Sequence, residues 1–242
     1  MLEIRHASLE PSATRRSYNR LYGDRGILLR DSFYIWLIGL LNPQLGKSLL
    51  DVSCGQGRLV FLAQQRGLIA HGVDFAIEAL RKSSTRTSQQ VLAVADGERL
   101  PYPKDSVDYV THIGSLEHYE DPLQGACEIR RVLRPGGRSC ILLPNAYGLL
   151  GNIKNVWITG DIHDDGQPLQ RYATRQSWIR LLSDAGLHVE RVVGYGEVEF
   201  PRTIRDASWL LRHPQKILRW LVSSVVPINL TNHFVFIVSP IR

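Results

Sequence analysis

Hydrophobic and polar positions alternate in blocks along the chain from about residue 48 onward. Short apolar runs predict strands, and stretches with apolar residues at helical spacing predict helices between them. The expected strands are 48–53, 69–75, 91–97, 107–114, 138–144, 187–195 and 233–240, and the expected helices are 58–67, 76–87, 121–133 and 175–186. This alternation favours a doubly wound α/β fold, in which helices cover both faces of a mostly parallel sheet. We expect seven strands, of which the last is antiparallel to the others.

Three segments do not fit this alternation and are expected to surround the sheet of a single domain, residues 1–242. Residues 1–47 are expected to form an N-terminal helical cover, and residues 147–172 and 197–231 are expected to be inserts. In such sheets, ligands bind beyond the carboxyl ends of the strands, near the switch in strand order. If the last strand is antiparallel, both inserts leave from that edge, and we expect them to roof the site.

Composition narrows the class of protein without deciding the function. Hydrophobic residues make up 44% and charged residues 21% of the 242 residues, which is typical of a globular fold. Cys54, Cys127 and Cys140 have no C-x-x-C spacing and are odd in number, so we expect a reducing, cytoplasmic environment. No apolar run approaches the roughly 20 residues that a bilayer span needs. The net charge of +6 allows an anionic partner such as nucleic acid or a membrane surface.

The stretch "LLDVSCGQGRLV", residues 49–60, carries the first candidate site. Asp51 ends an apolar run, and Gly55 and Gly57 follow in the turn before a helix. Glycine permits positive φ and lets backbone approach a ligand closely. A helix N-terminus also favours anionic or electron-rich groups. A tight turn with no ligand is the alternative interpretation of this stretch alone.

Acids at the next two strand ends strengthen the ligand interpretation. Asp74 ends the second strand, where a carboxylate can accept bonds from both ribose hydroxyls, and Asp96 ends the third, where it suits an adenine amino group. Either acid alone could be a helix cap or a turn former. The dinucleotide pattern G-x-G-x-x-G fails at Val60, and no GxxxxGK[ST] loop is present. The acid at Asp51 suits a cationic group such as a sulfonium or ammonium better than a pyrophosphate.

Five motifs now resemble one family. They are "LLDVSCGQGRL", "HGVDFA", "VADGERLPYPKDSVDYV", "GSLEHYEDP" and "EIRRVLRPGG", in this order and spacing. Across about residues 48–145 they look like a class I S-adenosylmethionine-dependent methyltransferase of the small-molecule and ubiquinone-biosynthesis branch. The resemblance implies a Rossmann-like fold, S-adenosylmethionine as cofactor with S-adenosylhomocysteine as product, and methyl transfer.

The resemblance also assigns roles to residues of this chain. The residues that fall at the methionine part of the cofactor are Asp51, Gly55 and Gly57; Asp74 falls at the ribose, Asp96 with Gly97 at the adenine, and Phe75, Ile113 and Ser115 in the same pocket. Tyr18 and Tyr22 lie on an N-terminal helix that covers the cofactor in similar enzymes, with ordinary helix packing as the alternative. Ser53 departs from the family, because it replaces the first glycine of D-x-G-x-G-x-G. Serine is small, so we expect cofactor binding to survive there.

Methyl transfer from a sulfonium needs alignment of the acceptor with the methyl group and exclusion of water. A base is required only where the acceptor must lose a proton. His118, in "SLEHYED", is the candidate catalytic residue, and cleft packing or a helix cap is the alternative. His163 with Asp161, Asp164 and Asp165 is better interpreted as an acidic polar loop than as a metal site, and we expect no metal.

The segment 201–230 is basic and apolar at once. The cations Arg202, Arg205, Arg212, Lys216 and Arg219 stand against Asp206 alone, with tryptophans and aliphatic residues between them. Pro214 is expected to split the segment into two short helices. Such an element can contact a membrane surface or a second copy through residues 202–226, can cap a site for an apolar acceptor, or can dock on its own domain.

Three functions follow from these observations. The first is methyl transfer to a small-molecule or lipid-like acceptor at O, N or C. The second is an RNA or protein methyltransferase; the net charge favours it, but nucleic acid is disfavoured because no N-P-P-Y run follows the fourth strand and no aromatic RNA platform is visible. The third is a non-catalytic cofactor-binding partner subunit, which Ser53 and the lack of a firm base suggest.

Overall fold

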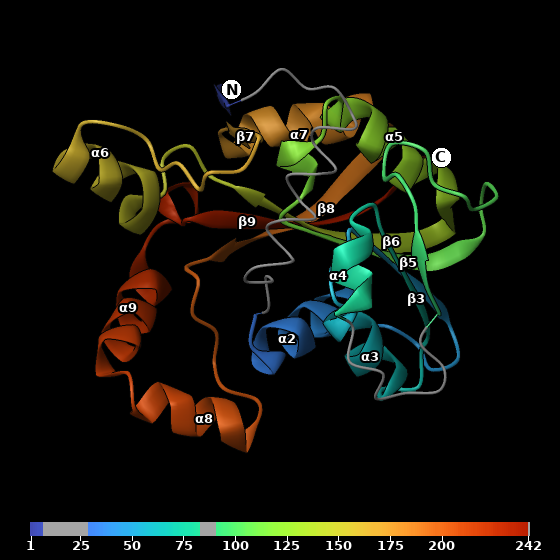
Figure 1. The fold of residues 1–242 in the computed structure, drawn as a ribbon, viewed down its shortest axis with the longest axis horizontal. Helices are drawn as coiled ribbons and strands as arrows, with labels where there is room; N and C mark the ends of the chain where they lie inside the picture. The colour runs from blue at the N-terminus through green and yellow to red at the C-terminus, as the bar shows by residue number, and fades with distance from the viewer. Residues whose placement is uncertain (7–28, 83–90, 242) are drawn as a thin grey trace.

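A seven-stranded sheet forms the centre of the computed structural model, which describes residues 1–6, 29–82 and 91–241 (Figure 1). The strand order is β4-β3-β2-β5-β6-β9-β8. The strands are β2 (Ser48–Val52), β3 (Ile69–Asp74), β4 (Val91–Val94), β5 (Val107–Ile113), β6 (Leu133–Pro144), β8 (Leu187–Tyr195) and β9 (His233–Pro240). Neighbours from β4 to β6 pair in parallel, and β9 pairs antiparallel with both β6 and β8. The predicted fold class, including the antiparallel last strand, is confirmed.

Helices bury both faces of this sheet, which explains why its strands are continuous apolar runs. Successive side chains of a strand point to opposite faces. Leu50 therefore joins a core with Ile129 and Trp178, whereas Leu49 joins a second core with Phe33 and residues of α3. The helices of the first core are α5 (Pro122–Val132) and α7 (Arg175–Asp184), and those of the second are α2 (Asp31–Leu41) and α3 (Arg58–Gln64). The short helix α4 (Ile77–Arg81) packs against β3 and β4.

Side-chain caps fix where two of these helices begin. Asp121 precedes α5 and accepts a hydrogen bond from the Gln124 backbone N–H at 3.0 Å, with a proline at the first helical position. Thr174 does the same for α7 by accepting from the Ser177 N–H at 3.1 Å. Local sequence therefore sets these helix starts before tertiary packing adds to them.

The N-terminus corrects one expectation. Residues 1–47 were expected to be helical; this holds for α2, but residues 2–5 form strand β1 (Leu2–Arg5). This strand pairs antiparallel with β7 (Leu169–Tyr172), all four residues of which are buried. The pairing partner is far away in the sequence, and it supplies the backbone hydrogen bonds that a four-residue segment cannot make by itself.

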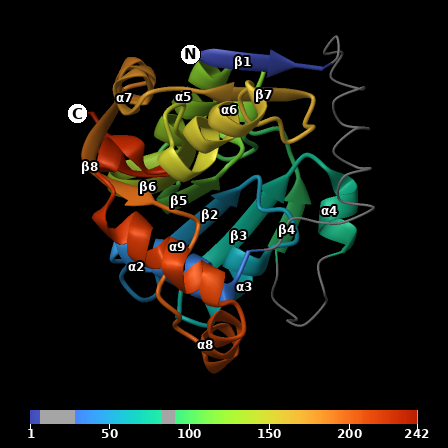
Figure 2. The ribbon, with the colours of Figure 1, turned by 90° about the vertical axis from the view of Figure 1, so that its left-hand side faces the viewer.

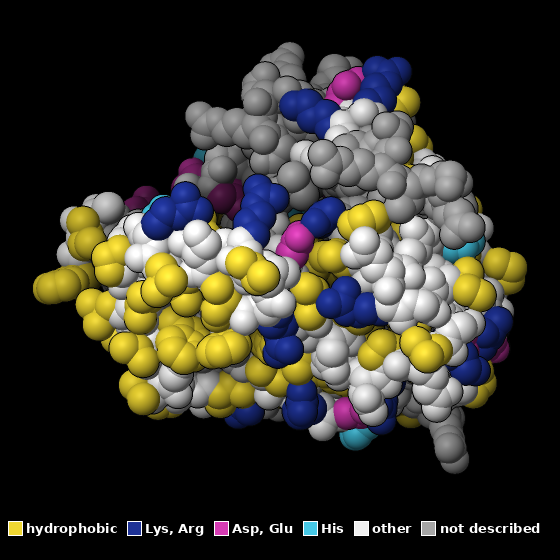
Figure 3. All heavy atoms as spheres, turned by 90° about the horizontal axis from the view of Figure 1, so that it is seen from below, with side chains coloured by type: hydrophobic (Ala, Val, Ile, Leu, Met, Phe, Trp, Pro, Cys, Tyr) yellow, Lys and Arg dark blue, Asp and Glu magenta, His cyan; other side chains and the backbone are white. Residues whose placement is uncertain are grey.

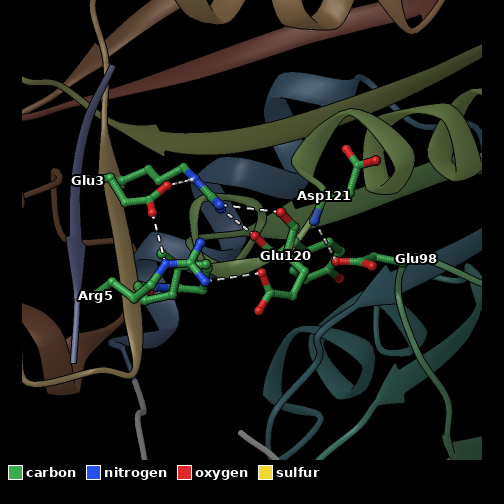
Figure 4. A network of polar contacts seen from close by, with 9 residues as sticks. Glu3, Arg5, Glu98, Glu120 and Asp121 are labelled. Atoms are coloured by element: carbon green, nitrogen blue, oxygen red, sulfur yellow. Dashed lines mark hydrogen bonds and ion pairs between the residues drawn. The ribbon is translucent and has the colours of Figure 1, made fainter. Parts of the chain in front are cut away.

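Polar contacts attach this small β1–β7 sheet to the chain that follows β5. Arg171 of β7 forms an ion pair with Glu3 at 2.8 Å and donates to the backbone carbonyls of Tyr119 and Glu120. Arg5 bridges Glu3 at 3.0 Å and Glu120 at 3.5 Å (Figure 4). Beside them, the Asp121 N–H donates to Glu98 at 3.1 Å. The short helix η1 (Leu116–His118) packs against β7 in the same region.

Both inserts lie at the carboxyl edge of the sheet. The first continues from the end of β6 and contains η2 (Leu149–Ile153), α6 (Lys154–Thr159) and β7; the second continues from the end of β8 and contains α8 (Ile204–Leu211), α9 (Pro214–Val225) and η3 (Ile228–Leu230). Helix α8 ends before Pro214 and α9 begins at it, so the predicted division into two helices is confirmed. Helices α6 and α9 stand at the left of Figure 1 and in front of the sheet in Figure 2.

Candidate functional site

The turn after β2 is fastened to the end of β3 by a buried carboxylate. Asp74 accepts hydrogen bonds from the backbone N–H groups of Gly55 and Ala76, both at 2.8 Å. Asp51 lies opposite Thr111 of β5 and accepts from its hydroxyl at 2.7 Å. Both carboxyl groups are only 4% exposed. The structure therefore brings Asp51, Asp74 and the glycine-rich turn together, as the sequence predicted.

Burial makes these two carboxyl groups costly to ionise. It raises the pKa of Asp51 to about 7; the charge of Asp74 adds to this effect, and the Thr111 hydroxyl opposes it. Burial also raises the pKa of Asp74, against backbone N–H donors that lower it. No ion pair recorded among the described residues involves either group. The folded chain holds the Asp51 proton more tightly than the unfolded chain, so this group reduces stability as pH rises from 3.8 to about 7.

Positive φ angles shape the turn itself. Gly55 has φ 55° and Gly57 has φ 73°, in the left-handed region that favours glycine. A Cβ at Gly57 would also come within 2.9 Å of the Leu92 side chain. Backbone conformation therefore favours both glycines, and at Gly57 an added Cβ would also displace the Leu92 side chain. Gly57 is also the N-cap residue that directly precedes α3.

Ser53 adopts the same left-handed conformation without being glycine, with φ 58°. A side chain in this region costs roughly 1–2 kcal/mol. The Ser53 hydroxyl lies 3.0 Å from the hydroxyl of Tyr119, which in turn lies 2.9 Å from Nε2 of His112. The departure from the family pattern thus has a local explanation, because the hydroxyl makes a bond that glycine could not make.

Tyr119 is a site residue that sequence reasoning missed. Its ring packs against Gly97, where an added Cβ would collide with the Tyr119 hydroxyl. It therefore joins the turn after β2, the end of β4 and, through His112, strand β5. The sequence places Tyr119 in the motif "GSLEHYEDP", after the fourth strand. The neighbouring residues in the sequence do not show which parts of the fold its side chain contacts.

The other predicted cofactor residues lie around this centre. Asp96 is exposed, and its carboxylate accepts from the Glu98 N–H at 2.9 Å, so here it acts as a turn former. Ile113 ends β5, and the Ser115 hydroxyl donates to its carbonyl at 3.2 Å. Phe75 is half-buried and directly follows Asp74. Tyr18 and Tyr22 lie outside the described residues.

His118 is held by the first insert in a defined protonation state. Its Nδ1 lies 2.5 Å from the Leu169 carbonyl of β7, and a carbonyl can only accept, so Nδ1 carries the hydrogen. The lone pair of the neutral ring is then on Nε2. Burial lowers the pKa of His118, so the ring is neutral at pH 7. His118 is thus packed inside the protein and is also in the neutral state that a general base needs.

Glu117 is a second residue that the sequence reasoning missed. Its side chain is 4% exposed, and burial raises its pKa to about 8. Oε1 lies 3.8 Å from His118 Nε2, and Oε2 has no hydrogen-bond partner among the described residues. A carboxyl group that is protonated near neutral pH can donate as well as accept. The Glu-His pair in "SLEHYED" was the only sequence signal for it.

The acidic loop around His163 has local roles. Asp164 accepts from the Gly166 N–H at 2.8 Å and lies 2.9 Å from Nε2 of His6. The Asp161 carboxylate accepts from the Ile162 N–H at 2.8 Å. Within the described ranges, no three His, Cys, Asp or Glu side chains are grouped as a metal site would require.

These features define a nucleoside-binding α/β domain whose ligand carries positive charge. The glycine turn provides close backbone approach, and acids follow three successive strands. Asp51 and Asp74 form a buried pair of carboxyl groups without a recorded cation partner in the part of the chain that the structure describes, and a sulfonium or ammonium beside Asp51 would favour its ionised form. The residues present therefore fit S-adenosylmethionine better than a dinucleotide or a triphosphate.

Comparisons with known proteins agree with this class. The sequence model of a family described as "Methyltransferase domain" matches residues 50–141. The chain is 30% identical to the 27-O-demethylrifamycin SV methyltransferase of Amycolatopsis mediterranei over 183 residues, 71% of this chain and 65% of that protein. It is 33% identical to a demethylmenaquinone methyltransferase of Deinococcus radiodurans over 119 residues, 46% of this chain and 49% of that protein. The chain thus spans between about half and two thirds of these relatives' length.

A solved structure shows the same fold. The S-adenosylmethionine-dependent methyltransferase from Mesorhizobium loti matches with a TM-score of 0.62 and 14% identity, over 86% of this chain and 97% of that one. Residues 50–141 of the chain form a methyltransferase domain of the class I S-adenosylmethionine-dependent kind, and S-adenosylmethionine is the methyl donor of this family. The resemblance predicted from the five motifs is confirmed.

The conformation of Ser53 gives a testable order of stabilities. Ser53→Ala removes the bond to Tyr119 but keeps a side chain at positive φ, so the free energy of unfolding should fall by about 1 kcal/mol. Ser53→Gly loses the same bond but relieves strain of similar size, so it should be more stable than Ser53→Ala. Equilibrium urea unfolding measures the order, with exposed Ser183→Ala as the matched control. An alanine variant as stable as wild type would contradict the explanation.

Proposed function

We propose that this chain transfers a methyl group from S-adenosylmethionine to a small-molecule or lipid-like acceptor, at O, N or C, by in-line displacement. The main support is the buried pair of carboxyl groups, Asp51 and Asp74, around the Gly55–Gly57 turn. Among the described residues, no cation pairs with either carboxyl group. The acceptor class is supported by the relatives, which are named for 27-O-demethylrifamycin SV and demethylmenaquinone.

The cofactor role of each residue follows from its place at the sheet edge. When bound, S-adenosylmethionine supplies a methyl group already activated by the sulfonium. Asp51 would face the cationic end, and the backbone of Gly55 and Gly57 would allow close approach. Asp74 would hold the ribose; backbone N–H groups, among them those of Gly55 and Ala76, already bond to its two oxygens, and the carboxylate keeps acceptor capacity for a hydroxyl. Asp96 and Gly97 would lie at the adenine.

His118 would act where the acceptor must lose a proton. The bond from Nδ1 to the Leu169 carbonyl fixes the tautomer and leaves Nε2 as the basic nitrogen. Strand β7, which supplies that carbonyl, is itself held by Arg171 and Glu3. The first insert therefore positions the base and would cover the acceptor at the same time.

Cofactor binding tests the first half of the proposal. Titration calorimetry should detect S-adenosylmethionine binding by the wild type, and Asp74→Ala should weaken it at least about tenfold, because the ribose loses its acceptor. Asp105→Asn, an acid at the opposite end of the sheet whose φ of 53° asparagine tolerates, should bind like wild type. Circular dichroism verifies that each variant is folded. A wild-type protein that binds no cofactor refutes the proposal.

The second half is tested by label transfer from methyl-labelled S-adenosylmethionine to a panel of phenols, quinols and isoprenoid lipids. With a hydroxyl acceptor, His118→Gln should lower turnover roughly 100-fold and leave the cofactor dissociation constant unchanged, because the base acts only in the chemical step. The exposed His188→Gln serves as control. Wild-type turnover in His118→Gln would show that this histidine only packs in the cleft.

A further inference from the structure

Helix α9 turns its apolar side away from the protein. None of its twelve residues is buried. Leu218, Leu221 and Val225 are 64%, 52% and 81% exposed, and their spacing of three and four residues places them on one side of the helix. A surface helix of a globular protein ordinarily presents its apolar side to the core. In α9, these three apolar side chains point to solvent instead.

The polar side of α9 attaches it to the rest of the fold. Arg219 forms an ion pair with Glu197 at 2.7 Å and donates to the carbonyls of Gly196 at 3.3 Å and Leu150 at 3.4 Å. The Ser223 side chain packs so closely on Gly196 that a Cβ there would collide with it. These polar contacts and the ring contact of Trp220 with Phe200 hold α9, and the contact to Leu150 joins the two inserts.

Helix α8 repeats the same orientation. Its buried residue is Asp206, which accepts from the backbone N–H of Ser32 at 2.8 Å and from the Ser32 hydroxyl at 2.6 Å. Ile204 and Leu211 point outward and are 91% and 76% exposed. An acid is therefore used to dock this helix while Ile204 and Leu211 face solvent.

Helix α6 of the first insert adds to the same apolar surface. It has no buried residue, and Trp157 and Ile158 are 85% and 65% exposed. Figure 3 shows a broad hydrophobic area on the side of the molecule where α6 and α9 lie, bordered by Lys and Arg side chains. Large continuous apolar areas are rare on monomeric proteins and mark contact surfaces.

The charge around this surface selects the partner. Arg202, Arg205 and Arg212 are exposed. Among the ion pairs recorded for the described residues, none includes these three cations. A cationic border around an apolar surface complements the interface of an anionic bilayer. A second copy would bring like charges together, which disfavours a symmetric dimer through the same surface.

We propose that α6, α8 and α9 form a membrane-docking surface, which places their outward apolar side chains in the interface of an anionic phospholipid bilayer and their cations at its headgroups. None of the described helices has the length and apolar character of a membrane span, so docking would be peripheral. The surface lies at the carboxyl edge of the sheet. Docking would thus bring the site toward lipid, although it does not require the proposed methyl transfer.

Vesicle co-sedimentation of the full chain tests the docking. Binding is expected to vesicles of phosphatidylcholine mixed with phosphatidylglycerol, and it should be much weaker to phosphatidylcholine alone and at high salt. On binding, the emission of exposed Trp157 should shift to shorter wavelength, and Trp157→Phe should remove most of that shift. Failure of the wild type to bind either kind of vesicle overturns the proposal.

Matched variants locate the surface. Leu218→Glu with Leu221→Glu should reduce binding at least about tenfold, because two outward leucines no longer enter the interface. Leu45→Glu, at a leucine 80% exposed at the opposite edge of the sheet, should not. Arg205→Glu, at an exposed cation of α8, should weaken binding to the mixed vesicles, and Lys104→Glu, at a lysine with a 65% exposed side chain, should do so less.

Two readouts separate the alternatives. Sedimentation velocity measures the oligomeric state of the wild type and of the double variant Leu218→Glu with Leu221→Glu. A wild-type dimer that this double variant dissociates, together with no vesicle binding by the wild type, would assign the surface to a second copy and overturn the proposal. The leucine variants should keep cofactor affinity, and Asp74→Ala should keep vesicle binding. Loss of methyl transfer alone would therefore leave the docking proposal standing.

Discussion

Two carboxyl groups buried at neighbouring strand ends determine how this site is built. Asp51 on β2 and Asp74 on β3 are nearly inaccessible, and burial raises the pKa of each. The fold tolerates them because Thr111 and backbone N–H groups satisfy their oxygens, and because the glycine turn after β2 can bend back to deliver one of those N–H groups. A bound cationic nucleoside would neutralise the negative charge that remains. The same two buried carboxyl groups therefore make folding more costly and would provide the binding site.

Elements outside the common sheet complete the site. Strand β7 of the first insert supplies the carbonyl that sets the tautomer of His118, and β1 pairs with β7 to hold it in place. Tyr119 connects Ser53, Gly97 and His112, so the position that departs from the family pattern is supported by a residue that directly follows η1. The second insert presents an apolar, cationic surface at the same edge. In the proposed function, the strand ends would hold the cofactor, and the inserts would position His118 and control access to the acceptor.

The central sheet could be predicted because its strands are buried on both faces and its helices carry local start signals such as Asp121 and Thr174. The acids at the strand ends could be predicted because parallel strands place their carboxyl ends on one edge. Strand β1 could not, since the strand it pairs with, β7, lies in an insert far along the chain. Tyr119 and Glu117 were missed for a similar reason: their roles depend on distances across the fold, and their types are unremarkable in sequence.

The most direct test of the buried carboxyl pair is the number of protons exchanged on cofactor binding, measured by calorimetry in buffers of different ionisation enthalpy. The pKa of Asp51 is raised to about 7 in the free protein, and a bound cation should ionise this group. At pH 7 the wild type should therefore release about half a proton more than Asp51→Asn on binding S-adenosylmethionine, and the difference should vanish well above that pKa. Equal proton numbers for the two proteins at pH 7 would contradict the account.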